Sequence, residues 1–488
     1  VQTCALPIYF LEKEKISQQL SAQVDVKHPW LAMTSMLIGA FVGMLSETSL
    51  NIALPTLGKV FNVEPSSLQW LVTGYMLVIG IVLPFLSLIS KWFTTRQIVI
   101  FALADFAIGA LISGFANSFT VLLIGRLIQG IGTGLILPLM FTVAMLIFPP
   151  QKLGAVMGVN ALVIMFAPAI GPTITGIILG ALSWRDIFFI FTVLLVIGLL
   201  FAIFTLENVN KITRPHVDVL SVLGSIIGFS SLVAGVSFAS ESGWTSFKVL
   251  GLILVAIIVL ILYARRQLKL ENPVLNLRVF SKVNFRTGAF LVMIDFGIIL
   301  SSMYLLPQFI QNAMLLPVAM TGIIMLPGGI INALVSAISG RLYDSIGAKI
   351  PATIGFFIAL LGSIMFIFAS EKSSVAYVIT AHIILMIGCP LAMSPSQTHG
   401  LNALQGPESA DGSTIMNTLQ QIVGAIATAI ATSLLGIGEA VSHSSNKAIS
   451  FTSGVHFGFY FTAFLTIVGL LLALTIKSKN KSQDIELH

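Results

Sequence analysis

The sequence predicts an all-α protein that crosses a membrane fourteen times, as three observations indicate. Of the 488 residues, 56% are hydrophobic and only 9% are charged, whereas a soluble domain carries about 25% charged residues. Apolar runs of about 20 residues, long enough for a helix to cross about 30 Å of hydrocarbon, occur fourteen times. The runs are continuous rather than alternating, which favours helices over a β-barrel.

The expected spans form three sets along the chain. They cover residues 31–54, 68–90, 97–115, 119–145, 155–182 and 187–204, then 219–238 and 247–264, and finally 287–306, 318–339, 350–369, 375–393, 412–435 and 457–476. This order predicts an N-terminal segment (1–29), a six-helix bundle (30–206), two extra helices (207–265), a loop (266–286), a second six-helix bundle (287–477) and a tail (478–488).

The basic residues predict how the chain is oriented. An even number of spans places both termini on one side. Of the 25 Lys and Arg residues, nineteen fall on that side and one, Arg126, lies within a span; the opposite side has five, namely Lys59, Arg185, Lys248, Lys372 and Lys447. Cytoplasmic loops carry the excess of Lys and Arg. The termini and the 266–286 loop are therefore expected in the cytoplasm, with the chain in the cell membrane.

Several partner and cofactor classes are not expected. No GxxxxGK[ST] phosphate loop occurs, and no connection is long enough for a soluble catalytic domain, which argues against ATP as the energy source. The net charge is +6, but the basic residues lie between apolar blocks rather than on a soluble surface, so no nucleic acid partner is expected. Cys4 and Cys389 are too far apart in the chain to indicate a metal site or a disulfide framework. No metal or organic cofactor is implied.

Two loops at equivalent positions of the two bundles form an internal repeat, SLISKWFTTR at 87–96 and GRLYDSIGAK at 340–349. The second copy resembles the GxLxDxxGxK signature of the major facilitator superfamily, in which this loop is a cytoplasmic latch. Its glycines allow a tight turn, and its acid can sit at a helix N-terminus or pair with a neighbouring base. The expected latch residues are Gly340, Arg341, Asp344, Gly347 and Lys349. In the first copy, Lys91 replaces the acid, and Ser87 and Thr94 replace the glycines.

The fifth span carries a face of small residues that resembles the antiporter motif of exporters in this superfamily. Its members are Gly158, Ala167, Gly171, Pro172, Thr175 and Gly176. Small residues four apart let helices approach closely, and a proline permits bending. Ordinary close packing is the alternative interpretation.

Arg126 in the fourth span lies in RLIQGIGTG, with Gln129 and Gly130, and resembles the RxxQGxG motif of the family. A central arginine costs about 2.5–3.5 kcal/mol on insertion scales, so it should face a cavity or an acid rather than lipid. The alternative is an arginine that only ties helices together.

The first span contains ETSLNIALP, in which Glu47 and Asn51 share one helix face. From the helical rise per residue, the depth of Glu47 in the membrane is expected to match that of Arg126. A buried carboxyl responds to both desolvation and a nearby positive charge, so its protonation can change with its surroundings. The segment resembles the LDxTxxNxALP signature of fourteen-span drug-proton antiporters, with Glu in place of Asp.

Other intramembrane polar residues complete the candidate site. Asp105 and Asp295 could each bind a proton or a cationic substrate, or form a hydrogen bond that fixes neighbouring helices. Trp70 and Tyr75 resemble family positions at the substrate cavity, although anchoring at the membrane interface explains them almost as well. His382 is interpreted as structural.

The resemblance covers residues 30–477 and implies a proton-coupled exporter of the drug-proton antiporter type, similar to Gram-positive lincosamide and multidrug exporters. It implies alternating access, protons as the coupling ion, an amphipathic or cationic small molecule as substrate, and the lipid bilayer as surroundings. An uptake symporter would share the fold, and the fifth-span motif disfavours it. An intramembrane enzyme would need a nucleophile–base pair or a metal cluster, and neither is found in the sequence.

Overall fold

The computed structural model describes residues 26, 28–209, 212, 218–271, 273–404, 407–442 and 444–476. The expected tail 478–488 and most of the expected segment 1–29 lie outside these residues. The regular structure in the described ranges is entirely helical. The helices are α2 (Pro29–Phe61), α3 (Pro65–Leu68), α4 (Trp70–Val82), η1 (Leu83–Phe85), α5 (Leu86–Trp92), α6 (Thr95–Gly114), α7 (Phe119–Ile147), α8 (Pro150–Ala181), α9 (Trp184–Thr205), α10 (Val219–Ser242), α11 (Phe247–Lys269), η2 (Leu277–Ser281), α12 (Val283–Gln308), η3 (Phe309–Ala313), α13 (Val318–Ile346), α14 (Lys349–Ile367), α15 (Val375–Leu401), α16 (Pro407–Val441) and α17 (Lys447–Leu474).

These helices confirm the all-helical, fourteen-span prediction. In the described ranges, thirteen helices are long and apolar enough to cross a membrane, and α8, which bends by 41° between Leu162–Pro168 and Ile170–Ala181, brings the number to fourteen. Two prolines, Pro168 and Pro172, lie inside α8 and explain the bend, since proline removes a backbone hydrogen bond and its ring crowds the preceding turn.

The second expected span, 68–90, differs from a single helix. It is divided into α4, a short 3-10 turn at η1 and α5, with Pro84 inside the turn. Proline cannot donate the backbone hydrogen bond that would continue the helix, so α5 leaves in a new direction. This break shapes the pocket described below.

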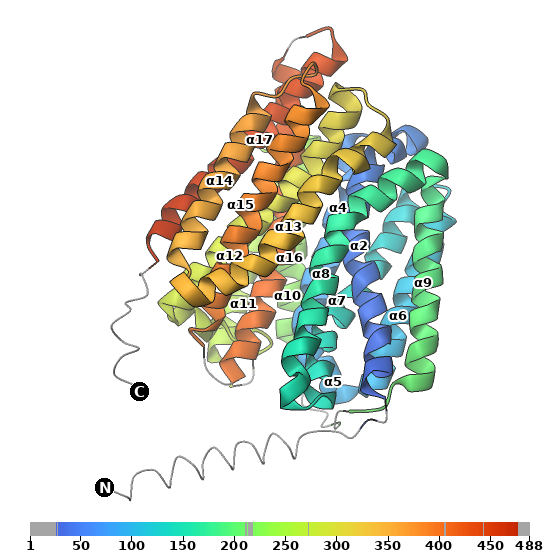
Figure 1. Cartoon of the computed structure of the whole chain (residues 1–488), viewed down its shortest axis with the longest axis vertical. Helices are drawn as coiled ribbons and strands as arrows, with labels where there is room; N and C mark the ends of the chain where they lie inside the picture. Colours follow the sequence, from blue (N-terminus) through green and yellow to red (C-terminus); the bar gives the residue numbers. More distant parts are fainter. Residues whose placement is uncertain are drawn as a thin grey trace, which may run out of the picture.

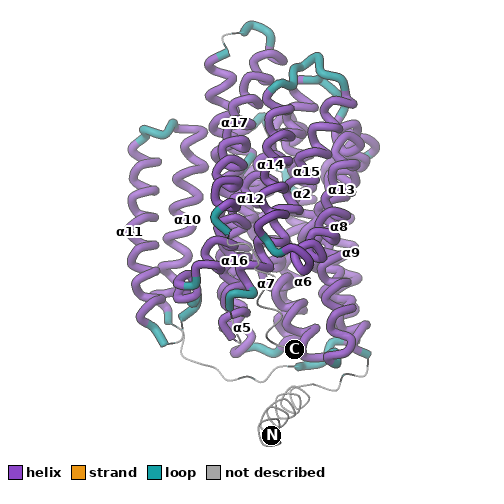
Figure 2. The backbone as a smooth tube through the Cα atoms, turned by 60° about the vertical axis from the view of Figure 1, so that its left-hand side comes forward, coloured by secondary structure: helices purple, strands orange, loops and turns teal. Residues whose placement is uncertain are grey.

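The helices described pack in two groups of six spans each, in which α4, η1 and α5 count as one span, and the α10–α11 pair comes between the groups in the sequence. The N-terminal group, α2 and α4 to α9, is joined by the contacts α6–α7, α6–α9 and α2–α8; the C-terminal group, α12 to α17, is joined by α14–α15, α13–α15 and α16–α17. Helices α10 and α11 form a separate hairpin, and α10 also contacts α16 and α4. Figure 2 shows this hairpin beside the rest of the molecule, with α11 outermost.

The two groups meet mainly through α8 with α13 and α4 with α16. We call the end at which α2 begins and α17 ends the termini end, and the opposite end the far end. The groups lie side by side toward the far end and diverge toward the termini end (Figure 1). At the far end, Thr173 Oγ1 donates a hydrogen bond of 3.0 Å to the carbonyl oxygen of Gly322. The structure is therefore closed at one end.

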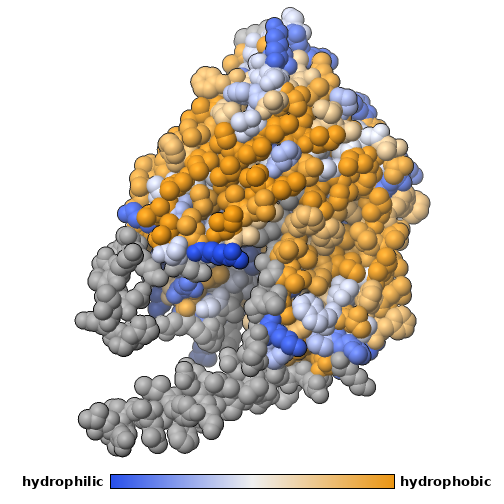
Figure 3. Space-filling view, viewed as in Figure 1, coloured by the Kyte–Doolittle hydropathy of each residue, from blue (hydrophilic) through white to orange (hydrophobic). Residues whose placement is uncertain are grey.

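Apolar side chains cover the middle of the face shown in Figure 3, and hydrophilic side chains gather toward its two ends. Exposed large aliphatic and aromatic side chains recur along α9, α10 and α11. Such a continuous apolar belt is the surface that a bilayer covers. The chain is therefore a multi-pass membrane protein.

Candidate functional site

Arg126 on α7 forms the centre of a buried polar cluster and has no exposed surface. Its Nη1 donates to Ser46 Oγ at 2.6 Å and to Gln129 Oε1 at 2.7 Å. Its Nε donates to the carbonyl oxygen of Leu71 at 3.1 Å. The guanidinium also lies over the ring of Tyr75, 4.0 Å from its centroid. The charge is thus stabilised by neutral acceptors and an aromatic face.

Glu47 on α2 follows Ser46 directly, so the same helical turn brings a carboxyl group to this cluster. Only 2% of Glu47 is exposed, and its Oε2 has no hydrogen-bond partner among the described residues. The carboxyl interacts with the side chain of Gln421 on α16 and with the charge of Arg126. No ion pair within 4.0 Å joins Glu47 to a described basic residue. The carboxyl is therefore buried at the junction of the two groups.

Tyr75 and Gln129, which both contact the arginine, are themselves held by hydrogen bonds to neighbouring helices. Tyr75 Oη donates to the carbonyl oxygen of Gly43 at 3.0 Å and shares a hydrogen bond of 2.8 Å with Thr133. Gln129 Nε2 donates to Ser113 Oγ at 3.3 Å. These contacts connect α2, α4, α6 and α7, so they fix the position of the guanidinium.

Three other candidates lie in different surroundings. Asn51, one helical turn beyond Glu47, is buried, and its Oδ1 has no described partner. The ring of Trp70 contacts that of Phe238 on α10 in a tilted arrangement, with centroids 5.5 Å apart. Gly130 packs against the backbone of Tyr75, whose carbonyl oxygen would stand 3.0 Å from a Cβ at Gly130. Tyr75 and Trp70 thus face different helices, although both were candidates for the same substrate cavity.

The small residues of α8 face two different helices. A Cβ at Gly171 would collide with Thr48 Oγ1 on α2, next to Glu47. A Cβ at Gly176 would stand 3.1 Å from Gly322 Cα on α13. Pro172 and Thr175 are buried between these two contacts, while the side-chain surroundings of Gly158 lie outside the described part of the chain. The motif therefore packs α8 closely within its own group and against the other group.

Asp105 and Asp295 have contrasting environments. Asp105 Oδ2 accepts a hydrogen bond of 3.0 Å from the backbone N–H of Gly132, which links α6 to α7. Asp295 on α12 has no exposed surface, and neither of its carboxyl oxygens forms a hydrogen bond with another described residue. The thiol of Cys389 on α15 lies close enough to interact with this carboxyl. His382, two turns before Cys389 on the same helix, is 3% exposed and lies against Gly328 of α13.

The repeated loops differ in how they turn. Gly340, Arg341 and Asp344 lie in the last turns of α13, Gly347 adopts a left-handed φ of 75°, and Lys349 begins α14. Asp344 is thus near the end of its helix rather than at an N-terminus, and its side chain lies outside the described part of the chain. In the first loop, Thr94 caps α6 and forms a capping box with Gln97. A capping side chain thus defines the turn where the second loop uses glycine.

Sequence reasoning missed Ser46, Gln421 and Cys389. Ser46 precedes Glu47 and would be expected to face away from it, but Arg126 is long enough to reach it. Gln421 and Cys389 come from distant helices, and nothing in a single sequence specifies which faces meet. In the described ranges, no group of three His, Cys, Asp or Glu residues is placed to hold a metal ion.

Comparisons with known proteins agree with this architecture. Residues 36–428 match the family model described as the Major Facilitator Superfamily. The chain is 41% identical over 452 residues to the lincomycin resistance protein LmrB of Listeria monocytogenes, covering 91% of this chain and 96% of that protein. It is 43% identical over 455 residues to LmrB of Bacillus subtilis, covering 91% and 95%. A peptide transporter of the POT family, solved in complex with sulfate, superposes with a TM-score of 0.67 at 14% identity, covering 93% of this chain and 97% of the other.

Proposed function

The chain belongs to the major facilitator superfamily, and from this premise we propose that it is a proton-coupled exporter of amphipathic small molecules that works by alternating access. Membership in this family makes it a transporter rather than an enzyme. The observation that carries the proposal is the carboxyl of Glu47, buried without an ion pair where the two groups meet.

The substrate class follows from the relatives. Two proteins that are 41% and 43% identical over nearly the whole chain are named for lincomycin resistance. Resistance through a membrane transporter requires export, and the small-residue face of α8 resembles the antiporter motif of exporters. We therefore assign export of amphipathic, drug-like compounds, cations among them, to this chain.

Proton coupling is assigned first to Glu47 and Arg126. An ionised carboxylate buried without an ion pair is costly, so the closed arrangement around Gln421 suits a neutral carboxyl. Separation of α2 from α16 admits water and leaves Arg126 as the nearest charge, which suits the ionised form. The proton would then move with the change between open and closed states. Asp295 and Asp105 complete the proposed set of proton-binding carboxyls, and Asn51, Trp70 and Tyr75 are proposed at the substrate cavity.

The orientation and energy source follow from charge. From the excess of Lys and Arg on that side, we assign the termini end to the cytoplasm and the chain to the plasma membrane. One proton moving through 100 mV supplies about 2.3 kcal/mol, equivalent to roughly a fifty-fold gradient of a neutral solute. ATP is not needed. The loop containing Gly340, Arg341, Asp344, Gly347 and Lys349 is proposed as the latch that closes the cytoplasmic side.

The proposal is tested with purified protein in liposomes under an imposed pH gradient. Glu47→Gln should fold and bind substrate but lose gradient-driven transport, whereas Glu47→Asp should retain part of it. Glu64→Gln, on an exposed residue before α3, is the matched control and should behave as wild type. Full gradient-driven transport by Glu47→Gln would remove Glu47 from coupling. Movement of substrate in the same direction as protons would instead identify a symporter.

A further inference from the structure

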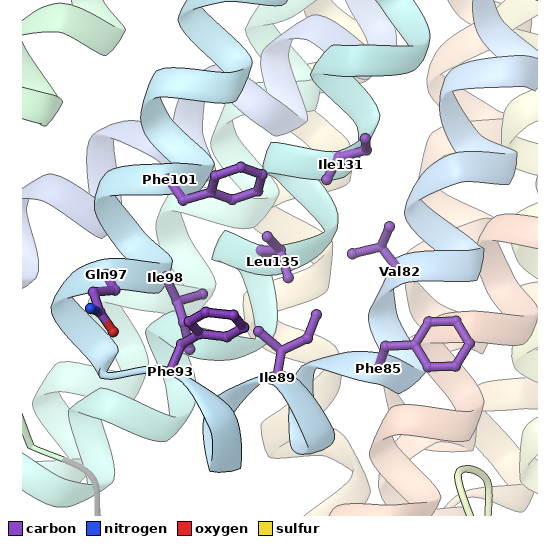
Figure 4. Close-up of a pocket in the computed structure, with 9 residues that line it drawn as sticks. All are labelled: Val82, Phe85, Ile89, Phe93, Gln97, Ile98, Phe101, Ile131 and Leu135. Carbon is purple, nitrogen blue, oxygen red and sulfur yellow. The ribbon is translucent and has the colours of Figure 1, made fainter. Parts of the chain in front are cut away.

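An apolar cavity of about 470 Å³ lies on the N-terminal group, away from the Glu47–Arg126 cluster. Figure 4 shows side chains from α4, α5, α6 and α7 around it, with Phe85 of η1 at one edge. Its volume is within the range of about 300–1000 Å³ that is typical of small-molecule sites. The lining residues are Val82, Phe85, Ile89, Phe93, Gln97, Ile98, Phe101, Ile131 and Leu135, of which only Gln97 is polar.

The cavity opens toward the bilayer rather than toward the junction of the two groups. Ile98 and Leu135 at its base are 3% and 2% exposed, whereas Phe93 and Phe101 at its rim are 51% and 56% exposed. The break at Pro84 turns α5 across the termini end of the cavity and keeps α4 apart from α6 (Figure 4). A lipid-facing slot with a closed base results.

A second cavity of about 490 Å³ continues from the first at the membrane surface. The two share Gln97 and Phe101, and the second adds Thr94, Arg96, Ile100 and Asn208. Arg96 Nη2 donates to the carbonyl oxygen of Ile203 at 2.6 Å. No described carboxylate lies within 4.0 Å of Arg96, so its charge has no anionic partner within the described protein.

We propose that the paired cavities bind one anionic phospholipid of the adjacent leaflet, with an acyl chain in the apolar cavity and the phosphate group beside Arg96. Three features favour this occupant over others. The apolar cavity has a hydrocarbon lining, it opens to lipid, and its polar end carries a positive charge that no described carboxylate neutralises. A cationic amphiphile would fit the slot but would be repelled by Arg96. Lys91, exposed at the end of α5, adds to the positive field at the same membrane surface.

The test is a lipid titration of detergent-purified, delipidated protein, followed by native mass spectrometry. The probes are phosphatidylglycerol and phosphatidylcholine with identical acyl chains. Wild type should bind one phosphatidylglycerol more tightly than phosphatidylcholine. Arg96→Gln should weaken binding of phosphatidylglycerol by about fivefold, the contribution of one basic residue near a membrane surface. Binding of phosphatidylcholine should weaken less, because its choline cation offsets the charge of its phosphate. Lys282→Gln, an exposed base at the same end of the protein, is the charge control and should change neither.

Filling the slot tests the acyl-chain part of the proposal. Ile131→Trp should reduce binding of both lipids, whereas Ile197→Trp, which adds the same bulk to an exposed position of α9, should not. Equal binding of the two lipids by the wild type would overturn the proposal, even if a variant failed to fold. Displacement of the bound lipid by a transported cation would overturn it as well, since the cavity would then be a substrate site. The titration measures lipid binding rather than transport, so its failure would refute the lipid site and leave the proposed transport function untouched.

Discussion

Gly322 on α13 is the position at which a single methyl group should act directly on the closed state. A Cβ there would stand 2.8 Å from the carbonyl oxygen of Pro172 and 2.9 Å from Thr173 Cα on α8. Both are backbone atoms, so no side chain can rotate away to make room. Only separation of α8 from α13 at the far end relieves the contact, and that separation is what opening of this end requires.

The magnitude follows from the cost of overpacking. An added methyl in a tight contact costs about 1–3 kcal/mol. If the cost falls only on the closed state, Gly322→Ala should raise the ratio of open to closed molecules by about 5- to 150-fold. Gly436 on α16 provides the control, because a Cβ there meets no atom within 4 Å.

Spin-label distance measurements at the far end would detect this shift. Labels at Leu182, after α8, and Lys372, between α14 and α15, are exposed and belong to different groups. Replacing Cys4 by Ser leaves Cys389, which is buried, as the remaining native thiol. Gly322→Ala should increase the population at longer distances, and Gly436→Ala should not. A Gly322→Ala protein that unfolds cooperatively yet shows the wild-type distance distribution would refute the reasoning.

Three further predictions concern packing and charge. Gly171→Leu should reach the membrane but lose transport, because the new side chain collides with Thr48 beside Glu47 at a cost of about 1–3 kcal/mol or more. Transport at the wild-type rate would show that the small-residue face of α8 serves only ordinary helix packing. Arg126→Lys should lose most transport, because one ammonium cannot reach Leu71 O, Ser46 Oγ and Gln129 Oε1 together; the check is efflux normalised to membrane-inserted protein. The hydrogen bond from Arg266 lowers the pKa of Asp218, before α10, from about 4 to about 2, so this pair stabilises the fold above pH 4 and loses its effect as the pH falls toward 2; Asp218→Asn should lower the melting temperature at pH 7, and a difference that persisted unchanged at pH 2 would contradict the assignment.

The fold class could be predicted from the sequence because the thickness of the bilayer requires each span to be a long apolar segment. Each span had to be an apolar run of about 20 residues, so the number of spans could be counted without knowledge of their contacts. Details that depend on single backbone positions were less accessible. The prediction of one span over 68–90 missed the turn at η1, although Pro84 is visible in the sequence, because proline inside a membrane helix is also compatible with a simple bend. In α8, two prolines produce that bend.

The candidate site was predictable in depth but not in its partners. Helical rise places Glu47 and Arg126 at one level, and the structure brings them together. The contact with Gln421 depends on which face α16 turns toward α2, and the proximity of Asp295 to Cys389 depends on the packing of α12 on α15. Nothing in one chain's periodicity specifies these rotations, because the side of a membrane helix that faces lipid is as apolar as the side that faces its neighbours.

The α10–α11 hairpin restricts how the far end can open. Gln69 Nε2, at the start of α4, donates to the carbonyl oxygen of Ser237 on α10 at 3.1 Å. Trp244, just beyond α10, donates from Nε1 to Ser433 Oγ on α16 at 3.0 Å. The hairpin is therefore bonded to both groups at one end of the molecule. If α4 separates from α16 at this end, the hairpin can stay with only one of them, so one of these two hydrogen bonds must break. The extra helices thus belong to the same mechanical unit as the junction between the groups, and the free energy of their contacts enters the balance between closed and open states.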